Sequence, residues 1–129
     1  LHQFFCEKIK LYFSRLASNK DENPVVFQIK EYLHQNYAVP SLSVPDISEH
    51  VRLSPTYVCT LFKNETGQTL NQYLTDYRIK MSKQFLSDPL YKITDISAKV
   101  GYSDGNYYSK AFRKIVGLSP SEYREKMLR

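Results

Sequence analysis

Apolar side chains recur at intervals of three and four residues along nearly the whole chain, which is the spacing of one face of an α-helix. Ser or Thr, often followed by Pro, precedes several of these segments, and Gly follows others, so helix starts and stops are marked. With their caps, the predicted helices span residues 24–36, 43–51, 54–67, 69–87, 93–100, 103–117 and 119–127. We therefore expect an all-α fold with seven helices from Pro24 onward.

The N-terminal segment has an apolar stripe of its own. It is formed by Leu1, Phe5, Ile9, Tyr12 and Leu16. This 4-3 spacing predicts a helix over residues 1–17 and resembles a coiled-coil seam. We expect residues 1–23 to link the chain to an upstream sensor or regulatory domain and to pair in a homodimer. Alternatively, this helix folds back on its own domain or has no stable structure alone, because isolated helices of this length are marginal.

The pattern of short helices occurs twice. Residues 46–51 return 49 positions later as residues 95–100, with Asp-Ile-Ser at the start and Val at the end of each. After a one-residue slip, six further positions return 50 residues later in identical or similar form: Tyr57, Phe62, Lys63, Gly67, Thr69 and Tyr73. Each copy consists of a helix, a short turn, a second helix, a glycine stop and a capped third helix, which is the layout of a helix-turn-helix unit. The first unit covers residues 43–67, the linking helix 70–87 and the second unit 93–117.

The turns of the two units differ at one position. Gly101 in the second turn suits a left-handed backbone, whereas the first unit has Arg52 there. If both turns keep the same geometry, Arg52 carries a cost of roughly 1–2 kcal/mol.

Composition narrows the classes of function. A chain of 129 residues that is 42% hydrophobic fits one globular domain. No apolar run approaches the ~18 residues of a membrane span, and two cysteines cannot form a disulfide framework, so we expect a cytoplasmic protein. The excess of 18 Lys and Arg over 13 Asp and Glu favours a polyanionic partner.

Residues 93–124 closely resemble the C-terminal signature of the AraC/XylS family of bacterial transcription regulators. Residues 53–67 and 73–79 also match, and the resemblance extends over residues 24–129. It implies a sequence-specific DNA-binding domain with two helix-turn-helix units on a rigid linking helix. The second helix of each unit would enter successive major grooves, about 34–36 Å apart. Double-stranded DNA is the expected partner and RNA polymerase a candidate partner, with no cofactor and no metal.

The outward positions near the start of a recognition helix reach base edges. The predicted base contacts are Thr56, Cys59, Thr60 and Lys63 in the first unit, and Gly105, Asn106, Ser109 and Lys110 in the second. Asn106 can pair with adenine through two hydrogen bonds, and Lys110 can donate to guanine. Thr60 stands where members of the resembled family often carry Arg, so guanine reading by the first unit is in doubt. Cys59 is expected to be a contact or a spacer, since no second metal ligand is spaced near it.

Basic side chains and helix N-termini are the candidates for phosphate contacts. The predicted side chains are Arg78, Lys80, Arg113, Lys114 and Arg124, and the predicted N-termini are those at Ser43, Ser54, Ser103 and Ser119. For each side chain the alternative is a solvated surface charge, and Arg78 could instead be a structural ion-pair partner.

Other classes of function fit less well. The three histidines, His2, His34 and His50, share no i, i+4 spacing, no glycine-rich phosphate loop occurs, and neither cysteine lies in a reactive motif, so we do not expect an enzyme. A helical protein-interaction module without DNA contact is the alternative, and it would need an exposed apolar groove. Asn106, Ser109 and Lys110 at outward recognition-helix positions favour DNA instead.

Overall fold

The computed structural model describes residues 22–128. Within this range the chain forms helices and no strand, which confirms the all-α prediction. The helices are α2 (Pro24–Asn36), α3 (Val44–Val51), α4 (Pro55–Thr66), α5 (Leu70–Leu86), α6 (Ile93–Lys99), α7 (Gly105–Val116) and α8 (Pro120–Met127). None of them is both long and apolar enough to cross a membrane. The helix expected over residues 1–17 lies outside the described residues.

Local capping explains most of the helix boundaries. Thr69 and Ser119 open α5 and α8 with reciprocal capping boxes, in which a Gln or Glu side chain three residues on accepts from the cap's backbone N–H. Ser54 caps α4 through its hydroxyl. At the start of α7, where the sequence offers Ser103 and Asp104 as the cap, Asp104 is the N-cap.

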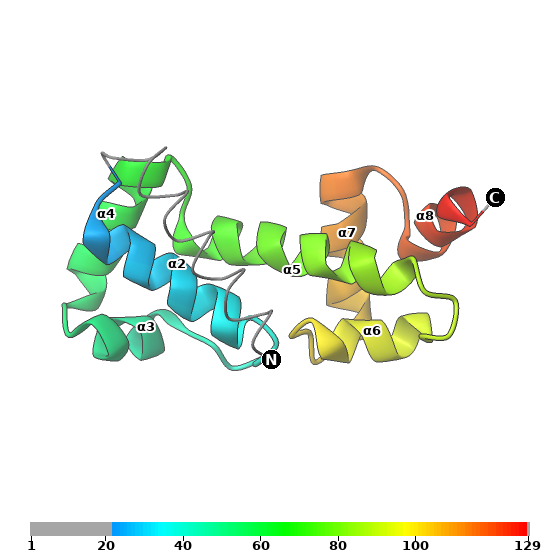
Figure 1. Cartoon of the computed structure of the whole chain (residues 1–129), viewed down its shortest axis with the longest axis horizontal. Coiled ribbons are helices and arrows are strands. Elements are labelled where there is room, and N and C mark those ends of the chain that lie inside the picture. Colours follow the sequence, from blue (N-terminus) through cyan, green and yellow to red (C-terminus); the bar gives the residue numbers. More distant parts are fainter. Residues whose placement is uncertain (1–21, 129) are drawn as a thin grey trace, which may run out of the picture.

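The long helix α5 runs through the middle of the molecule, with α2, α3 and α4 on its first half and α6, α7 and α8 on its second half (Figure 1). Each half has its own apolar core. The first core is formed by Val26, Ile29, Leu33, Ile47, Val58, Phe62, Leu70 and Leu74. The second core is formed by Ile79, Leu86, Ile96, Val100, Tyr108 and Phe112. Because α5 packs into both cores, it connects the two units through side-chain packing as well as through the backbone.

The turn of each helix-turn-helix unit passes through a left-handed residue. Arg52 has φ 59° and Gly101 has φ 98°, so the two turns keep the same type of geometry and Arg52 carries the conformational cost. Arg52 is the one non-glycine residue with positive φ in the described part of the chain.

Candidate nucleic-acid interface

The second helix of each unit turns equivalent faces inward. Val58 and Phe62 of α4 are buried, and so are Tyr108 and Phe112 of α7, which lie 50 residues further on. Since successive residues of a helix are turned by about 100°, these pairs fix which face of α4 and α7 points to solvent. In Figure 1 both helices stand nearly upright, one on each side of the molecule.

The predicted base-contact residues lie almost entirely on the outward faces. Thr56, Cys59, Thr60 and Lys63 are all exposed and share one side of α4. The structure likewise brings Asn106, Ser109 and Lys110 together on the exposed side of α7. The set on α4 spans about two helical turns and the set on α7 about one, which is an extent that fits a major groove.

Gly105 differs from the other members of its set. It is the first residue of α7, and a Cβ atom added to it would lie 3.9 Å from the Ser97 hydroxyl oxygen on α6. Gly105 is exposed, but a side chain there would point toward the first helix of its own unit, and glycine itself offers no side chain to a base.

Positive charge is concentrated on the second recognition helix. On α7, Lys110, Arg113 and Lys114 are all exposed. On α4 the one basic residue is Lys63. Its Nζ donates to the carbonyl of Gly67, the C-cap residue of the same helix, at 3.1 Å. The exposed face of α7 is therefore more positively charged than that of α4 and should attract a polyanion more strongly.

Carboxylates occupy three of the four helix N-termini that were predicted to meet phosphates. The Asp104 side chain accepts from the Asn106 backbone N–H at 2.8 Å at the start of α7. Asp46 and Glu122 accept from the backbone N–H groups of Ser43 and Ser119, each at 3.0 Å.

Hydrogen bonds from the Ser119 backbone and side chain hold the pKa of Glu122 below its usual value, so this carboxylate stays charged. Of these four helices, α4 alone, capped by the Ser54 hydroxyl, begins without a carboxylate at the cap or in the first turn. We therefore keep Ser54 alone as a candidate N-terminus for phosphate, because a fixed negative charge disfavours a second anion.

The prediction of a phosphate contact for Arg78 is wrong. Its side chain is buried, with the residue 9% exposed. Its guanidinium donates from Nε to the Tyr37 carbonyl at 2.8 Å and from a terminal nitrogen to the Val39 carbonyl at 2.9 Å. The side chain therefore has a structural role, as the alternative prediction proposed, but it donates to backbone carbonyls after α2 rather than pairing with a carboxylate.

Arg124 makes the same pair of bonds in the second unit. Its Nε donates to the Leu86 carbonyl at 3.1 Å and a terminal nitrogen donates to the Asp88 carbonyl at 3.2 Å. These acceptors lie 49 residues after Tyr37 and Val39, at the last residue of α5 and in the loop that follows it. The half-buried Arg124 is thus held against a loop, and we remove both arginines from the candidate phosphate contacts.

Lys80 lies on the solvent side of α5. It belongs to an exposed strip with Gln72, Asp76 and Gln84, which follow one another at four-residue intervals. Asp76 stands one helical turn before Lys80, so this strip is polar rather than strongly basic.

Two tyrosines near the recognition-helix starts were not predicted as site residues. Tyr57 and Tyr107 are each the third residue of their helix, and they are 51% and 69% exposed. A phenol hydroxyl in this position can donate to a phosphate oxygen. The signal was present in the sequence, because the repeat places both tyrosines beside predicted base contacts, Thr56 and Asn106.

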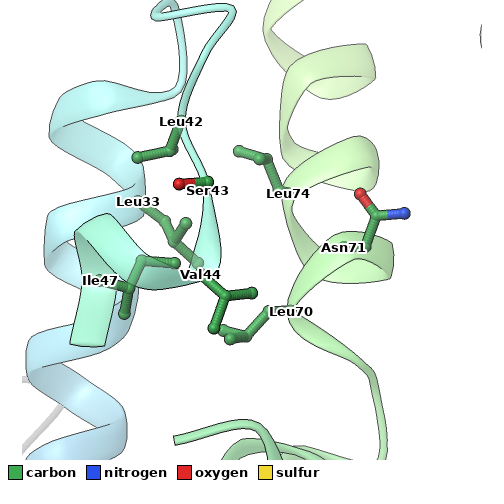
Figure 2. Close-up of a pocket in the computed structure, with 8 residues that line it drawn as sticks. All are labelled: Leu33, Leu42, Ser43, Val44, Ile47, Leu70, Asn71 and Leu74. Atoms are coloured by element: carbon green, nitrogen blue, oxygen red, sulfur yellow. The ribbon is translucent and has the colours of Figure 1, made fainter. Parts of the chain in front are cut away.

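A small apolar hollow lies within the first unit. It has a volume of about 200 Å³, and apolar side chains of α2, α3, α5 and the loop before α3 point toward one another around it (Figure 2). Leu33, Ile47, Leu70 and Leu74 in its lining are core residues, and the only polar members are Ser43 and Asn71. This lining offers no titratable side chain for acid–base chemistry, and half of its residues belong to the buried core.

Comparison with known proteins places this geometry among DNA-binding domains. A family model described as "Helix-turn-helix domain" matches residues 47–126. The Msm operon regulatory protein of Streptococcus mutans is 36% identical over 110 residues, which cover 85% of this chain and 39% of that protein. The C-terminal domain of AraT, a response regulator from Geobacillus stearothermophilus, superposes with a TM-score of 0.78 at 29% identity and covers 81% of this chain and 86% of that one.

A structure solved with DNA shares the fold. The DNA-binding domain of AdpA, a global transcriptional factor in complex with a target DNA, superposes with a TM-score of 0.72 at 19% identity, covering 81% of this chain and 93% of that one. The chain spans about two fifths of the length of the curated relatives it matches.

Proposed function

Because the chain belongs to the AraC/XylS-type family of helix-turn-helix DNA-binding domains, we propose that it binds duplex DNA sequence-specifically and regulates transcription. The recognition helices α4 and α7 would enter successive major grooves on one face of the duplex. One observation carries this proposal: two equivalent helices expose equivalent faces while both pack against α5. The 17 residues of α5 span about 25 Å, a rigid element of the right order for spacing two grooves.

The two units are proposed to read bases unequally. In the first unit Thr56, Cys59, Thr60 and Lys63 supply short or weakly directional groups. In the second, Asn106 offers a two-bond pairing with adenine, and Lys110 and Ser109 offer further donors. Gly105 would contribute close approach of the backbone rather than a side chain. Specificity should therefore reside mainly in α7.

Phosphates are proposed to be contacted by the remaining exposed groups on and near the recognition helices. These are Lys80, Arg113 and Lys114, the hydroxyls of Tyr57 and Tyr107, and the N-terminus of α4 at Ser54. Such contacts fix the register of the domain on the duplex without reading its sequence.

The whole protein to which this chain belongs is proposed to be a bacterial, cytoplasmic regulator without catalytic activity. The names of its relatives support regulation of operons by proteins of this kind. Residues 24–129 would form the DNA-binding domain, and residues 1–23 would connect it to an upstream regulatory domain and support a homodimer. RNA polymerase is the proposed protein partner at the promoter.

Selection of bound sequences from a pool of random duplexes tests the central proposal. We expect an enriched site with two half-sites about one helical turn, roughly 10 base pairs, apart. The half-site read by α7 should be the more sharply defined one. Absence of any enriched sequence at low salt would contradict DNA reading and leave a protein-interaction module as the better explanation.

A further inference from the structure

The two units touch each other directly, beside their shared packing on α5. The Tyr37 side chain, in the loop after α2, packs against both apolar cores. Gly101, in the turn of the second unit, lies so close to the Tyr37 carbonyl oxygen that a Cβ atom there would overlap it. The same added atom would lie 2.7 Å from Nε and 2.9 Å from Cζ of Arg78. The turn of the second helix-turn-helix unit therefore rests on a loop of the first.

Arg78 lies at the centre of this contact. From α5 it donates to the carbonyls of Tyr37 and Val39 in the first unit. Its guanidinium carbon lies 5.5 Å from the ring centre of Tyr102 in the second unit. One planar cation thus binds the backbone of one unit and faces an aromatic ring of the other. Burial lowers the pKa of Arg78 and raises that of Tyr102, as expected where two surfaces exclude water.

Arg78 lies between the parts of α5 that contribute to the two apolar cores. Between Leu74, in the first core, and Ile79, in the second, Arg78 is the only buried residue. Asp76 is exposed there, and Thr75 and Tyr77 are half-buried. Residues 75–78 thus contribute to neither apolar core, although the Tyr77 ring stacks on His34 at 4.3 Å and meets the Tyr37 ring edge-on at 5.1 Å, both in the first unit.

Arg124 provides an internal comparison. It makes the corresponding pair of hydrogen bonds to the end of α5 and the loop after it, but both acceptors belong to its own unit. Both arginines therefore bind backbone carbonyls at the end of a helix. Joining one unit to the other is particular to Arg78, because Gly101 and Tyr102 pack on it.

We propose that Arg78, Tyr37 and Gly101 form an inter-unit contact that fixes the two recognition helices as one rigid body and so determines the half-site spacing that the domain accepts. Arg78 is a positioning residue in this proposal, because it is buried away from the outward faces of α4 and α7. The spacing readout rests on the proposed DNA-binding function, whereas the rigidity of the two units does not.

The spacing test compares the wild-type chain with Arg78→Met, which keeps a long side chain but removes both donors. Binding is measured on the selected two-site duplex, on duplexes with one base pair added or removed between half-sites, and on a single half-site. Each base pair turns the second site by about 35°.

The wild-type chain should lose affinity sharply when a base pair is added or removed. Arg78→Met should bind the best spacing about tenfold more weakly, because the second half-site is no longer presented at a fixed position. It should also discriminate less between spacings and bind the single half-site unchanged.

A distance measurement without DNA makes the proposal independent of the proposed function. Spin labels are placed at Cys59 on α4, which is exposed, and at Ser109→Cys on α7, with Cys6→Ser removing the other thiol. Wild type should give one narrow distance, Arg78→Met a broad distribution, and the matched control Arg124→Met a narrow one. If Arg78→Met does not fold, as judged by circular dichroism, Arg78→Lys is measured in the same way.

The outcomes separate the two proposals. A narrow distance in the Arg78 variant together with a wild-type spacing profile would overturn the inter-unit contact as the source of spacing. An equal loss on single and double sites would do the same. If the wild-type chain binds no two-site duplex, the proposed function fails, and the label distances still decide whether Arg78 makes the units rigid.

Discussion

Arg52 and Gly101 hold the same left-handed backbone at corresponding turns, although only one of them is glycine. In each turn the next residue's N–H closes a bond to a buried serine carbonyl, Leu53 to Ser48 at 3.1 Å and Tyr102 to Ser97 at 2.9 Å. The cost of a side chain at this position differs between the two turns. At Gly101 a Cβ atom would overlap Tyr37 and Arg78, whereas Arg52 is exposed and has only the conformational cost.

Replacing Arg52 by glycine should therefore stabilise the domain. We expect Arg52→Gly to be about 1 kcal/mol more stable than Arg52→Ala, which keeps the Cβ atom and the strained φ. That difference corresponds to roughly 4 °C in melting temperature for a domain of this size. Thermal unfolding followed by circular dichroism measures it, and a glycine variant no more stable than the alanine variant would contradict the assignment of strain to this backbone.

Binding of the selected duplex should weaken steeply with salt. Each phosphate contact contributes about −0.9 to the slope of log K against log salt, so loss of one contact is measurable. Lys114→Ala should reduce the magnitude of the slope by about one. Lys30→Ala is the matched control, because Lys30 already pairs with Glu22 at 3.0 Å and should leave the slope unchanged. Equal slopes for all three proteins would remove Lys114 from the phosphate contacts.

Asn106→Ala should relax the base preference of one half-site. Loss of a two-bond pairing with adenine costs about 1–3 kcal/mol on the best site and much less on sites that lack the adenine. Competition binding against single-base variants of the site measures this difference. Asn71→Ala, an exposed asparagine on α5, is the control and should leave the preference intact. Equal weakening on every sequence would instead mark Asn106 as a backbone contact.

Removing the negative charge at the start of α7 should strengthen DNA binding. Asp104→Asn keeps an oxygen acceptor for the Asn106 N–H and preserves the cap, but it frees the helix N-terminus for a phosphate. Affinity at low salt should rise by about two- to fivefold, which is about 0.5–1 kcal/mol. Asp76→Asn changes the net charge equally on α5, so a matching gain there would attribute the effect to overall charge.

The segment before the described residues should mediate self-association. Its apolar stripe is suited to pairing with a second copy, so sedimentation at several concentrations should show mass rising with concentration. Deletion of residues 1–19, or Phe5→Glu with Ile9→Glu, should give a monomer at all concentrations. A wild-type chain that is already monomeric throughout would refute dimerisation by this segment.

The helices and the repeat could be predicted from sequence because their signals are local. Ser54, Thr69 and Ser119 cap as predicted, and the buried pairs Val58–Phe62 and Tyr108–Phe112 follow from periodicity. The roles of Arg78 and Arg124 could not be predicted in this way. Their acceptors lie 36 to 41 residues away, and a buried arginine looks the same in sequence as a solvated one.

The sequence also could not decide which residue of the Ser103–Asp104 pair caps α7. Both Ser103 and Asp104 are good N-caps, and the path of the backbone after α6 determines which of them begins the helix. That one-residue difference decides whether a hydroxyl or a carboxylate stands at the start of the second recognition helix.

The sharing of α5 between the two cores bears on how such a domain can evolve. Inserting one residue into α5 would turn the second unit by about 100° and move it by about 1.5 Å, and it would also take Gly101 away from Tyr37. The spacing between half-sites therefore cannot change gradually through insertion of single residues into α5. New operators would instead be acquired by exchanging single side chains on the outward faces of α4 and α7, while the interval between half-sites is inherited unchanged.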